Sequence, residues 1–193
     1  MKLHLSRFVC LDVASNLVRM EQEGARAAAS GADLCVFPEA FLHGYRRQLD
    51  PALARARFRT LSGDCPDTAF LFGSITEDRR NRLTVWQGGE QKASYDKVHL
   101  FRPTGEFDLW QPGDRYAAVR LKDWTLGLLT CNDLRFPEQA RALLPVIAHR
   151  YPEVVRDVRL GTVSTLDGDP DLRNQLVRLI ALAGMRGAAT GAP

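Results

Sequence analysis

The sequence predicts a single α/β domain built around a mixed β-sheet. A helical stretch over residues 16–30 separates the first two apolar runs, whereas the apolar runs after residue 69 are separated by short turns. Strand–helix–strand followed by meandering strands is typical of a mixed sheet with helices on one face. With 193 residues, of which 45% are hydrophobic, the chain can bury a sizeable core.

Four elements are expected in the first 60 residues. They are a strand over 8–13, a helix from Asn16 to about Ser30, a short buried strand over 33–37 and an arginine-rich helix over 51–60. Asparagine is a residue type that caps helices, and Gly31 is placed to end this one. Pro38 cannot donate to a β-ladder, so it ends the second strand and places Glu39 at the strand's exit.

The chain from there to about residue 150 is expected to hold five strands and one helix. The strands lie over 69–76, 83–87, 91–97, 116–121 and 125–129, and the helix over 138–150. Gly88-Gly89 is a hairpin signal, and residues 102–114 have the Pro, Gly and Asp content of a loop. Pro137 suits a first helical turn, whereas Pro145 would kink or end the helix.

The charge pattern argues against nucleic acid and membranes as partners. The formal net charge is +3 and only four of the 26 basic residues are lysines, but no Lys/Arg run or nucleic-acid motif accompanies the arginines. No apolar run approaches the ~18 residues that a membrane span needs. Lys2, His4 and Arg7 interrupt any signal peptide at the start. A cytoplasmic protein is therefore expected.

Among the four cysteines, Cys131 has the surroundings of a nucleophile. The chain shows no CxxC pair and no metal-ligand spacing, so reduced thiols and no bound metal are expected. Cys10 and Cys35 lie in apolar runs, and Cys65 lies in a loop-like stretch. Cys131 follows the apolar run 124–129 and precedes Phe-Pro-Glu, which starts a helix whose N-terminus offers positive potential to a thiolate. A buried core thiol is the alternative.

Two further segments, taken with the Cys131 segment, resemble those of a known family. They are Val36-Phe37-Pro38-Glu39-Ala40-Phe41 and Tyr95-Asp96-Lys97-Val98-His99-Leu100-Phe101. A glutamate, a lysine and a cysteine in this chain order, each at the end of an apolar run, resemble the triad of the nitrilase superfamily of carbon–nitrogen hydrolases. The resemblance covers roughly the first three-quarters of the chain. It implies a nitrilase-type αββα sandwich, incomplete at its C-terminus.

The resemblance implies catalytic roles for Glu39, Lys97 and Cys131. Cys131 would be the nucleophile that forms an acyl-enzyme, and Glu39 the general base and then the acid for the leaving ammonia. Lys97 would lower the thiol pKa and stabilise the oxyanion, with the backbone N–H of Asn132 as a candidate second donor. Glu106 occupies the place of the family's second glutamate, which positions the substrate. This set requires no metal or cofactor.

Three other residues near these motifs have more than one interpretation. Tyr45 either lines the substrate pocket or packs in a turn. His99 is expected to be structural, hydrogen-bonded near Lys97, rather than catalytic. Glu138 suits a helix-dipole partner at least as well as a catalytic group.

The resemblance stops after Arg141. Residues 1–145 are therefore expected to form the carbon–nitrogen hydrolase domain, and residues 146–193 a divergent segment with a helix over 171–185 and disorder over 187–193. This segment is either a divergent substitute for the family's last strands and helix or a translation out of the original frame. Missing strands would leave an apolar sheet face and open edges.

The leading functional hypothesis is an amidase-type hydrolase acting on a small linear amide or carbamoyl compound. The residues after Cys131 favour the amidase and carbamoylase branches over true nitrilases. The alternative is a truncated, catalytically impaired relative that acts as a binding or oligomerisation module. Family members commonly associate, so a homo-oligomer is an expectation that the altered C-terminal segment leaves open. The sequence does not name the substrate, because specificity in this family resides in loops around the pocket.

Overall fold

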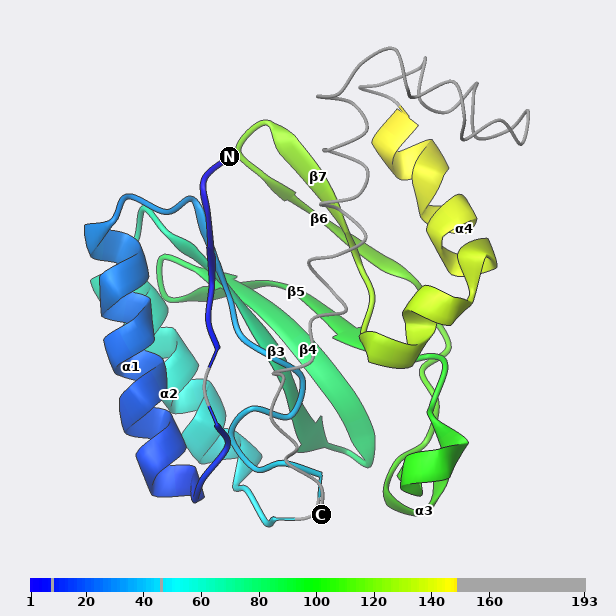
Figure 1. Cartoon of the computed structure of the whole chain (residues 1–193). Coiled ribbons are helices and arrows are strands. Elements are labelled where there is room, and N and C mark those ends of the chain that lie inside the picture. The colour runs from blue at the N-terminus through cyan, green and yellow to red at the C-terminus, as the bar shows by residue number, and fades with distance from the viewer. Residues whose placement is uncertain (8, 46, 149–193) are drawn as a thin grey trace.

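The computed structural model describes residues 1–148 except Phe8 and Arg46 (Figure 1). In chain order the elements are β1 (Leu3–Leu5), α1 (Val13–Ala29), β2 (Leu34–Val36), α2 (Pro51–Asp64), β3 (Ala69–Glu77), β4 (Arg80–Gln87), β5 (Glu90–Asp96), η1 (Arg102–Thr104), α3 (Glu106–Leu109), β6 (Ala117–Leu121), β7 (Trp124–Leu128), η2 (Cys131–Arg135) and α4 (Pro137–Ala148). The elements η1 and η2 are short 3₁₀-helices.

The larger sheet is mixed, as the sequence predicts. Its strand order is β1-β2-β3-β4-β5, and β6 and β7 form a second, two-stranded sheet. The strands β1, β2 and β3 run parallel, whereas β3, β4 and β5 pair antiparallel. The parallel strands are joined through α1 and α2, and the antiparallel strands are joined by the tight turns that the sequence signals.

The layers run helix, sheet, sheet, helix, which is the αββα arrangement (Figure 1). One apolar core lies between the helices α1 and α2 and the large sheet, and includes Met20, Phe58 and Phe72. A second core lies between the large sheet and the β6–β7 hairpin, and includes Leu71 and Leu126. Side chains thus fill both faces of the central strands, which explains their nearly continuous apolar sequence.

Helices cover one face of the large mixed sheet, as the sequence predicts, and the second sheet has a covering helix of its own. Helix α4 packs on the outer side of the β6–β7 hairpin, where a Cβ added at Gly127 would stand 2.9 Å from Leu143 Cδ1. A two-stranded sheet has an apolar inner face but little core of its own, so its outer face also needs a covering element.

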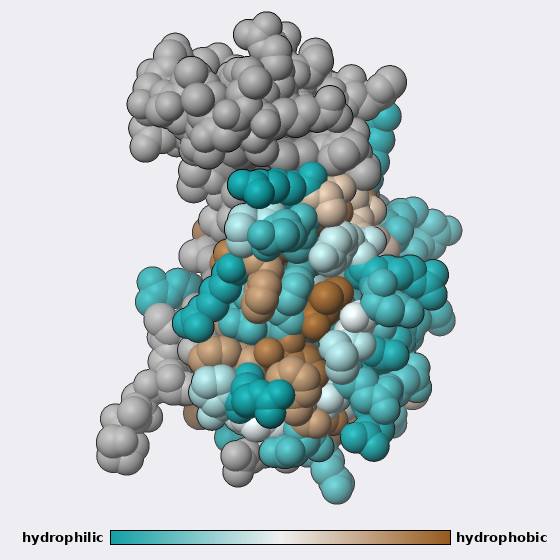
Figure 2. Space-filling view, turned by 90° about the vertical axis from the view of Figure 1, so that its right-hand side faces the viewer, coloured by the Kyte–Doolittle hydropathy of each residue, from teal (hydrophilic) through white to brown (hydrophobic). Residues whose placement is uncertain are grey.

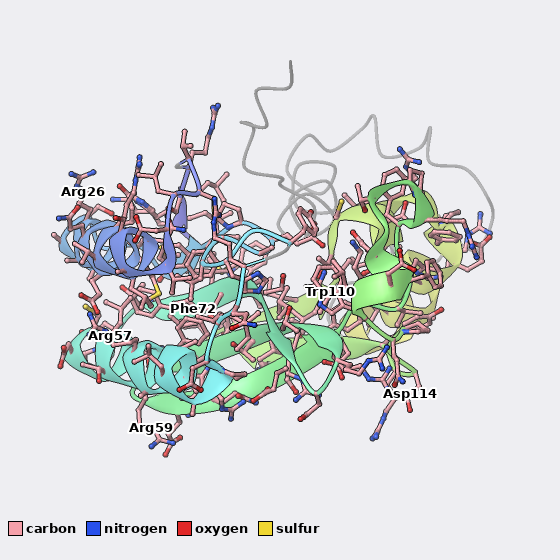
Figure 3. All side chains as sticks on the ribbon, turned by 90° about the horizontal axis from the view of Figure 1, so that it is seen from below. Arg26, Arg57, Arg59, Phe72, Trp110 and Asp114 are labelled. Atoms are coloured by element: carbon pink, nitrogen blue, oxygen red, sulfur yellow. The ribbon has the colours of Figure 1, made fainter. Side chains whose placement is uncertain are left out.

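Aromatic rings dominate the core beneath the helices. The rings of Phe58 and Phe72 are stacked at 3.8 Å between centroids, and Phe37 stacks on Phe72 at 5.4 Å. Figure 3 shows Phe72 between the helical layer and the sheet, with Arg59 directed outward. Helix α1 meets this core through residues spaced three or four apart, among them Leu17, Met20, Gly24 and Ala27.

The N-terminal strand and helix cap differ from the prediction. No strand forms at residues 9–13; β1 lies at Leu3–Leu5, and Val9 and Leu11 are about half exposed. Asp12 caps α1, because its carboxylate accepts a hydrogen bond from Ser15 N at 2.9 Å. Asn16 lies inside the helix and is buried, with Nδ2 donating to a loop carbonyl. The apolar pattern of this run predicts a strand, but the structure has no β-ladder there, and the N–H of Leu11 donates to Asn16 Oδ1 instead.

Other boundaries shift without changing the order of elements. Helix α2 continues to Asp64, and the predicted loop over 102–114 contains η1 and α3. Helix α4 continues past Pro145 to Ala148, so this proline does not end it. The helix expected over 171–185 and the disorder expected over 187–193 lie outside the described residues.

The face of the molecule on the side of α3 and α4 is mixed in polarity. Figure 2 shows hydrophobic surface gathered there beside hydrophilic surface. Among the exposed large apolar side chains are Phe107 in α3, Leu134 in η2 and Phe136 before α4. No helix within residues 1–148 is both long enough and apolar enough to traverse a bilayer.

Candidate active site

Glu39 lies in the loop directly after β2, and an irregularity in β3 supports this loop. The register between β3 and β4 shifts between residues 72 and 75. Within the shifted segment, Gly73 leaves no room for a Cβ, because the backbone of Pro38 occupies that space. A glycine in a strand often marks such a close backbone approach. The position of the carboxylate therefore follows from the packing of β2 against β3.

The rest of this loop is anchored to β3 by side-chain hydrogen bonds. Ala40 has a φ of +52°, and its N–H donates to Ser74 Oγ at 2.9 Å. The buried His43 accepts at Nε2 from the N–H of Thr76 at 3.1 Å. Burial lowers the pKa of His43, so it keeps the neutral form that an accepting nitrogen requires. These contacts hold a strained turn in one conformation.

Lys97 directly follows β5 and is fully buried between two carboxylates. Its Nζ lies 2.8 Å from Glu39 Oε1 and 2.8 Å from Glu106 Oε2. Burial by itself lowers the pKa of Lys97, but the two carboxylates outweigh it and the pKa is raised. Lys97 is therefore a cation held in a site shielded from water.

Both carboxylates have further donors. Glu39 accepts from Asn81 Nδ2 at 2.8 Å and from the Tyr45 hydroxyl at 2.9 Å, and its side chain is only 5% exposed. Glu106 accepts from the N–H of Phe101 at 2.8 Å. Several donors on one carboxylate fix its orientation and compensate for its removal from water.

The surroundings of Tyr45 keep its hydroxyl protonated. Burial is the largest cause that raises the pKa of the Tyr45 hydroxyl, followed by Glu39. Negative charge on Glu106 or on Cys131 acts on the pKa of this hydroxyl in the same direction. Tyr45 therefore stays a hydrogen-bond donor to Glu39 at neutral pH.

Cys131 occupies a strained turn where the chain leaves β7 and enters η2. It has a φ of +48°, in the left-handed region that costs a non-glycine residue roughly 1–2 kcal/mol. Its side chain is partly exposed and is not in a disulfide. Strain of this kind persists only where the surroundings enforce it, and it is frequent at active sites.

The residues that follow Cys131 tie this turn to the chain after Lys97. The Asn132 side chain donates to the carbonyls of His99 and Leu100, at 3.1 and 3.2 Å, and so is directed toward protein groups. The fully buried Asp133 accepts from Tyr95 at 2.7 Å and from the His99 N–H at 2.8 Å. The structural role expected of His99 agrees with these contacts.

The structure thus joins most of the predicted site residues. Hydrogen bonds connect Lys97, Glu39, Glu106 and Tyr45, as described above. Glu138 is exposed in the first turn of α4, where a helix-dipole partner is expected. The sequence interpretation overlooked Asp133, although an acid three residues after a threonine at a strand exit is the spacing of a capping box.

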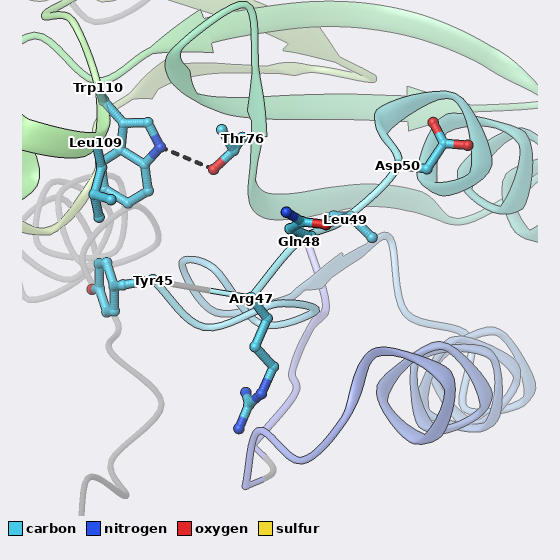
Figure 4. Close-up of a pocket in the computed structure, with 8 residues that line it drawn as sticks. All are labelled: Tyr45, Arg47, Gln48, Leu49, Asp50, Thr76, Leu109 and Trp110. Carbon is cyan, nitrogen blue, oxygen red and sulfur yellow. Dashed lines mark hydrogen bonds between the residues drawn. The ribbon is translucent and has the colours of Figure 1, made fainter.

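A pocket of about 520 Å³ adjoins this network at Tyr45 (Figure 4). Its lining residues are Tyr45, Arg47, Gln48, Leu49, Asp50, Thr76, Leu109 and Trp110. The indole of Trp110 is fixed by a hydrogen bond from Nε1 to Thr76 Oγ1 at 2.9 Å, and its ring lies 5.7 Å from that of Tyr45. The triad side chains do not line this pocket, so Tyr45 is the contact between the two.

Comparison of the sequence with known proteins assigns the chain to a family. Residues 4–145 match the family model of carbon–nitrogen hydrolases. The chain is 37% identical over 150 residues to "Hydrolase in pqqF 5'region" of Pseudomonas protegens, covering 69% of this chain and 50% of the relative. It is 33% identical to an (R)-stereoselective amidase of a Pseudomonas species, covering 68% and 51%. The chain thus spans about half the length of these relatives.

The fold matches that of a solved amidase of the nitrilase superfamily. The amidase from Nesterenkonia sp. superposes with a TM-score of 0.67 at 30% identity, covering 74% of this chain and 59% of that one. One mutant of the amidase from Nesterenkonia sp. AN1 shows acrylamide added at the active site cysteine, and another mutant is in complex with butyramide. The predicted nitrilase-type fold is therefore confirmed for the part of this chain that the structure describes.

Proposed function

The chain belongs to the carbon–nitrogen hydrolase family, and we propose that it is a thiol hydrolase of small linear amides. The substrate's C–N bond is cleaved through an acyl-enzyme on Cys131, with release of ammonia. The observation that carries this proposal is the Lys97 ammonium, buried between Glu39 and Glu106 at 2.8 Å from each. Such a buried cation is costly unless paired, and here its surroundings hold it charged.

Acylation begins when the Glu39 carboxylate takes the proton of the Cys131 thiol. The thiolate sulfur then bonds to the amide carbon, and the carbonyl electron pair moves to oxygen. Lys97 Nζ and the backbone N–H of Asn132 stabilise this oxyanion. As the C–N bond breaks, Glu39 returns the proton to the leaving nitrogen, which departs as ammonia.

Deacylation uses the same groups in reverse order. Glu39 takes a proton from a water molecule, whose oxygen attacks the thioester carbon while Lys97 again stabilises the oxyanion. Collapse breaks the C–S bond, releases the carboxylic acid and returns the proton to the Cys131 sulfur. Glu106 orients Lys97 and the bound amide, and Tyr45 orients Glu39 through its hydroxyl.

The proposed substrates are short aliphatic amides. The structure of the Nesterenkonia amidase with butyramide supports this choice, because butyramide has the size and polarity of such a substrate. The pocket next to Tyr45 offers space for the part of the substrate that does not react. A carbamoyl compound has the same carbonyl and leaving nitrogen and is the second compound to test.

The test is ammonia release from butyramide by the full chain. The wild type is expected to release ammonia continuously, and Cys131→Ala to release none. Cys65→Ala is the matched control, because this thiol is also partly exposed and outside any disulfide but lies at the end of α2. Equal rates of ammonia release by the wild type and by Cys131→Ala would contradict the proposal.

The second candidate is a catalytically impaired relative that acts by self-association. Two observations favour it: the chain spans about half the length of its relatives, and the apolar side chains of Phe107, Leu134 and Phe136 are exposed. In this case residues 1–145 fold as a hydrolase domain and residues 146–193 form a separate segment. The protein would then be a homo-oligomer located in the cytoplasm. Absence of turnover together with a concentration-dependent oligomer in sedimentation velocity would favour this candidate.

A further inference from the structure

We propose that Asp133 is a positioning residue that sets the Cys131 turn against the segment carrying Lys97. This inference rests on the proposed function, since it concerns how thiol and ammonium are held together. Asp133 itself touches neither reacting group in the hydrogen bonds described. It acts through the backbone on either side of them.

The Asp133 carboxylate is fully buried and saturated with donors. Oδ2 accepts from the Tyr95 hydroxyl at 2.7 Å and from the Thr130 N–H at 2.8 Å. Oδ1 accepts from the His99 N–H at 2.8 Å and lies 3.0 Å from His99 Nδ1. A buried carboxylate is tolerated only with such compensation, so its place is fixed by several bonds at once.

These donors come from both halves of the proposed site. Tyr95 lies two residues before Lys97, and His99 lies two residues after it. Thr130 directly precedes Cys131. One carboxylate therefore connects the chain on both sides of the ammonium to the turn that presents the thiol.

Tyr95 extends the connection to α4. Its hydroxyl accepts from Gln139 Nε2 at 2.7 Å and from the N–H of Val98 at 3.1 Å, while it donates to Asp133. The Tyr95 and Gln139 side chains are both buried. Tyr95 in β5 thus bonds to Asp133 beside the Cys131 turn, and Gln139 in α4 bonds to Tyr95. Both elements therefore hold the turn in place.

The backbone of Cys131 is strained, and the hydrogen bonds of Asp133 have to hold it in this conformation. A residue with φ of +48° relaxes toward an ordinary conformation unless its neighbours prevent it. The bond from Thr130 N–H to Asp133 closes the turn around Cys131, and the bonds from His99 prevent the turn from rotating away. Loss of the carboxylate charge would weaken all of these bonds, and an asparagine would direct N–H groups at some of the same donors.

The experiment compares the wild type with Asp133→Asn and Tyr95→Phe. Butyramide turnover is measured as kcat and KM separately, and alkylation of Cys131 by iodoacetamide is followed by peptide mass spectrometry with Cys65 as internal reference. For Asp133→Asn we expect kcat to fall about 100-fold with KM changed less than about threefold, since misplacement of ~1 Å costs about that much. Cys131 alkylation is expected to slow by at least tenfold.

Tyr95→Phe removes the hydroxyl that donates to Asp133 and accepts from Gln139 and Val98. The carboxylate and its backbone donors remain, so a smaller fall of about tenfold in kcat is expected. The control is Thr68→Val, which removes a buried hydrogen bond from Thr68 Oγ1 to Ala32 O at 2.8 Å on the opposite side of the sheet. Its kcat and its Cys131 alkylation are expected to match the wild type, even where its unfolding midpoint falls. A fall of kcat in this control equal to that in Tyr95→Phe would assign the effect to stability and overturn the proposal.

The alkylation readout separates this proposal from the proposed function. If the wild type does not hydrolyse amides, Cys131 alkylation still compares the variants, and slower alkylation in both supports the positioning role. Equal Cys131 alkylation rates in the wild type and in the two variants overturn it, whatever the turnover. Should Asp133→Asn fail to fold, Tyr95→Phe alone decides by the same criterion.

Discussion

Gly73 lies so close to Pro38 that a Cβ added at residue 73 would stand 1.8 Å from the Pro38 carbonyl oxygen. No side-chain rotation relieves this contact, because the place of a Cβ is fixed by its own backbone and the atoms it would meet are backbone atoms. Since Pro38 directly precedes Glu39, the contact connects the shape of β3 to the position of the proposed general base.

Gly73→Ala is therefore expected to lower both stability and activity. Overpacking of this kind costs about 1–3 kcal/mol or more in the free energy of unfolding, which urea titration measures. A displaced Glu39 should also lower kcat about 100-fold. Gly63→Ala is the control, because its Cβ would meet nothing closer than 3.7 Å. A Gly73→Ala protein as stable and active as the control would contradict the account.

Lys97→Met is expected to destabilise the protein strongly. The substitution leaves the Glu39 and Glu106 carboxylates buried without their shared cation, and breaking a buried pair in this way costs roughly 3–5 kcal/mol. The free energy of unfolding at pH 7 measures this loss. A change below about 1 kcal/mol would mean that the ammonium is not the partner of both carboxylates.

A double-mutant cycle of Lys97→Met with Glu106→Gln tests the same pairing without reference to activity. Glu106→Gln removes one of the two stranded charges, so the double variant is expected to be more stable than the sum of the single losses predicts. The coupling should amount to roughly 0.5–3 kcal/mol, as for other residues in direct contact. Strictly additive losses would show that the two side chains act independently.

Tyr45→Phe is expected to lower kcat about tenfold. The hydroxyl donates to Glu39, and a hydrogen bond to a charged group contributes about 1.5–3 kcal/mol. The phenylalanine keeps the ring contact with Trp110, so the free energy of unfolding should fall by no more than the contribution of this hydrogen bond. Steady-state kinetics with butyramide, beside thermal melting, separates the two effects. Unchanged kcat would assign Tyr45 to packing alone, which is the alternative that the sequence left open.

Alkaline pH is expected to destabilise the protein through Cys35. Burial raises the pKa of the Cys35 thiol from 9.0 to about 12. Above pH 9 the unfolded chain loses this proton while the folded chain keeps it, so the stability contribution present below pH 9 is lost as pH rises toward 12. Lys97, whose pKa is also raised, acts in the same direction. Urea unfolding of Cys35→Ala should show a smaller fall between pH 9 and 11 than the wild type.

The sequence predicted those parts of the fold that local chemistry determines. The proline after β2 and the glycine pair between β4 and β5 are strong signals, and the structure has a strand exit and a hairpin at these places. The resemblance to the nitrilase superfamily, through its αββα sandwich, predicted the second sheet and the outer helix as well. Residue patterns alone indicated helices on one face, because nothing local to residues 117–128 shows which element covers the hairpin.

Long-range contacts explain what the sequence did not show. The strand misplaced at residues 8–13 has an apolar pattern, but pairing with β2 selects Leu3–Leu5 instead. Asp133 was overlooked because its partners Tyr95 and His99 lie 38 and 34 residues away. By contrast, Glu39, Lys97 and Glu106 were named by their motifs, and the structure joins them in one network.

The central claim is that Cys131 carries the acyl group during hydrolysis, and trapping this group tests it most directly. The protein is mixed with butyramide, quenched in acid within milliseconds to seconds and digested, and the Cys131 peptide is weighed by mass spectrometry, with a parallel reaction in hydroxylamine. The account predicts a butyryl thioester on Cys131, butyrohydroxamate in the parallel reaction, and neither product with Cys131→Ala. Butyramide hydrolysis with the butyryl group on another residue, or an unmodified Cys131 with no hydroxamate formed, would contradict it.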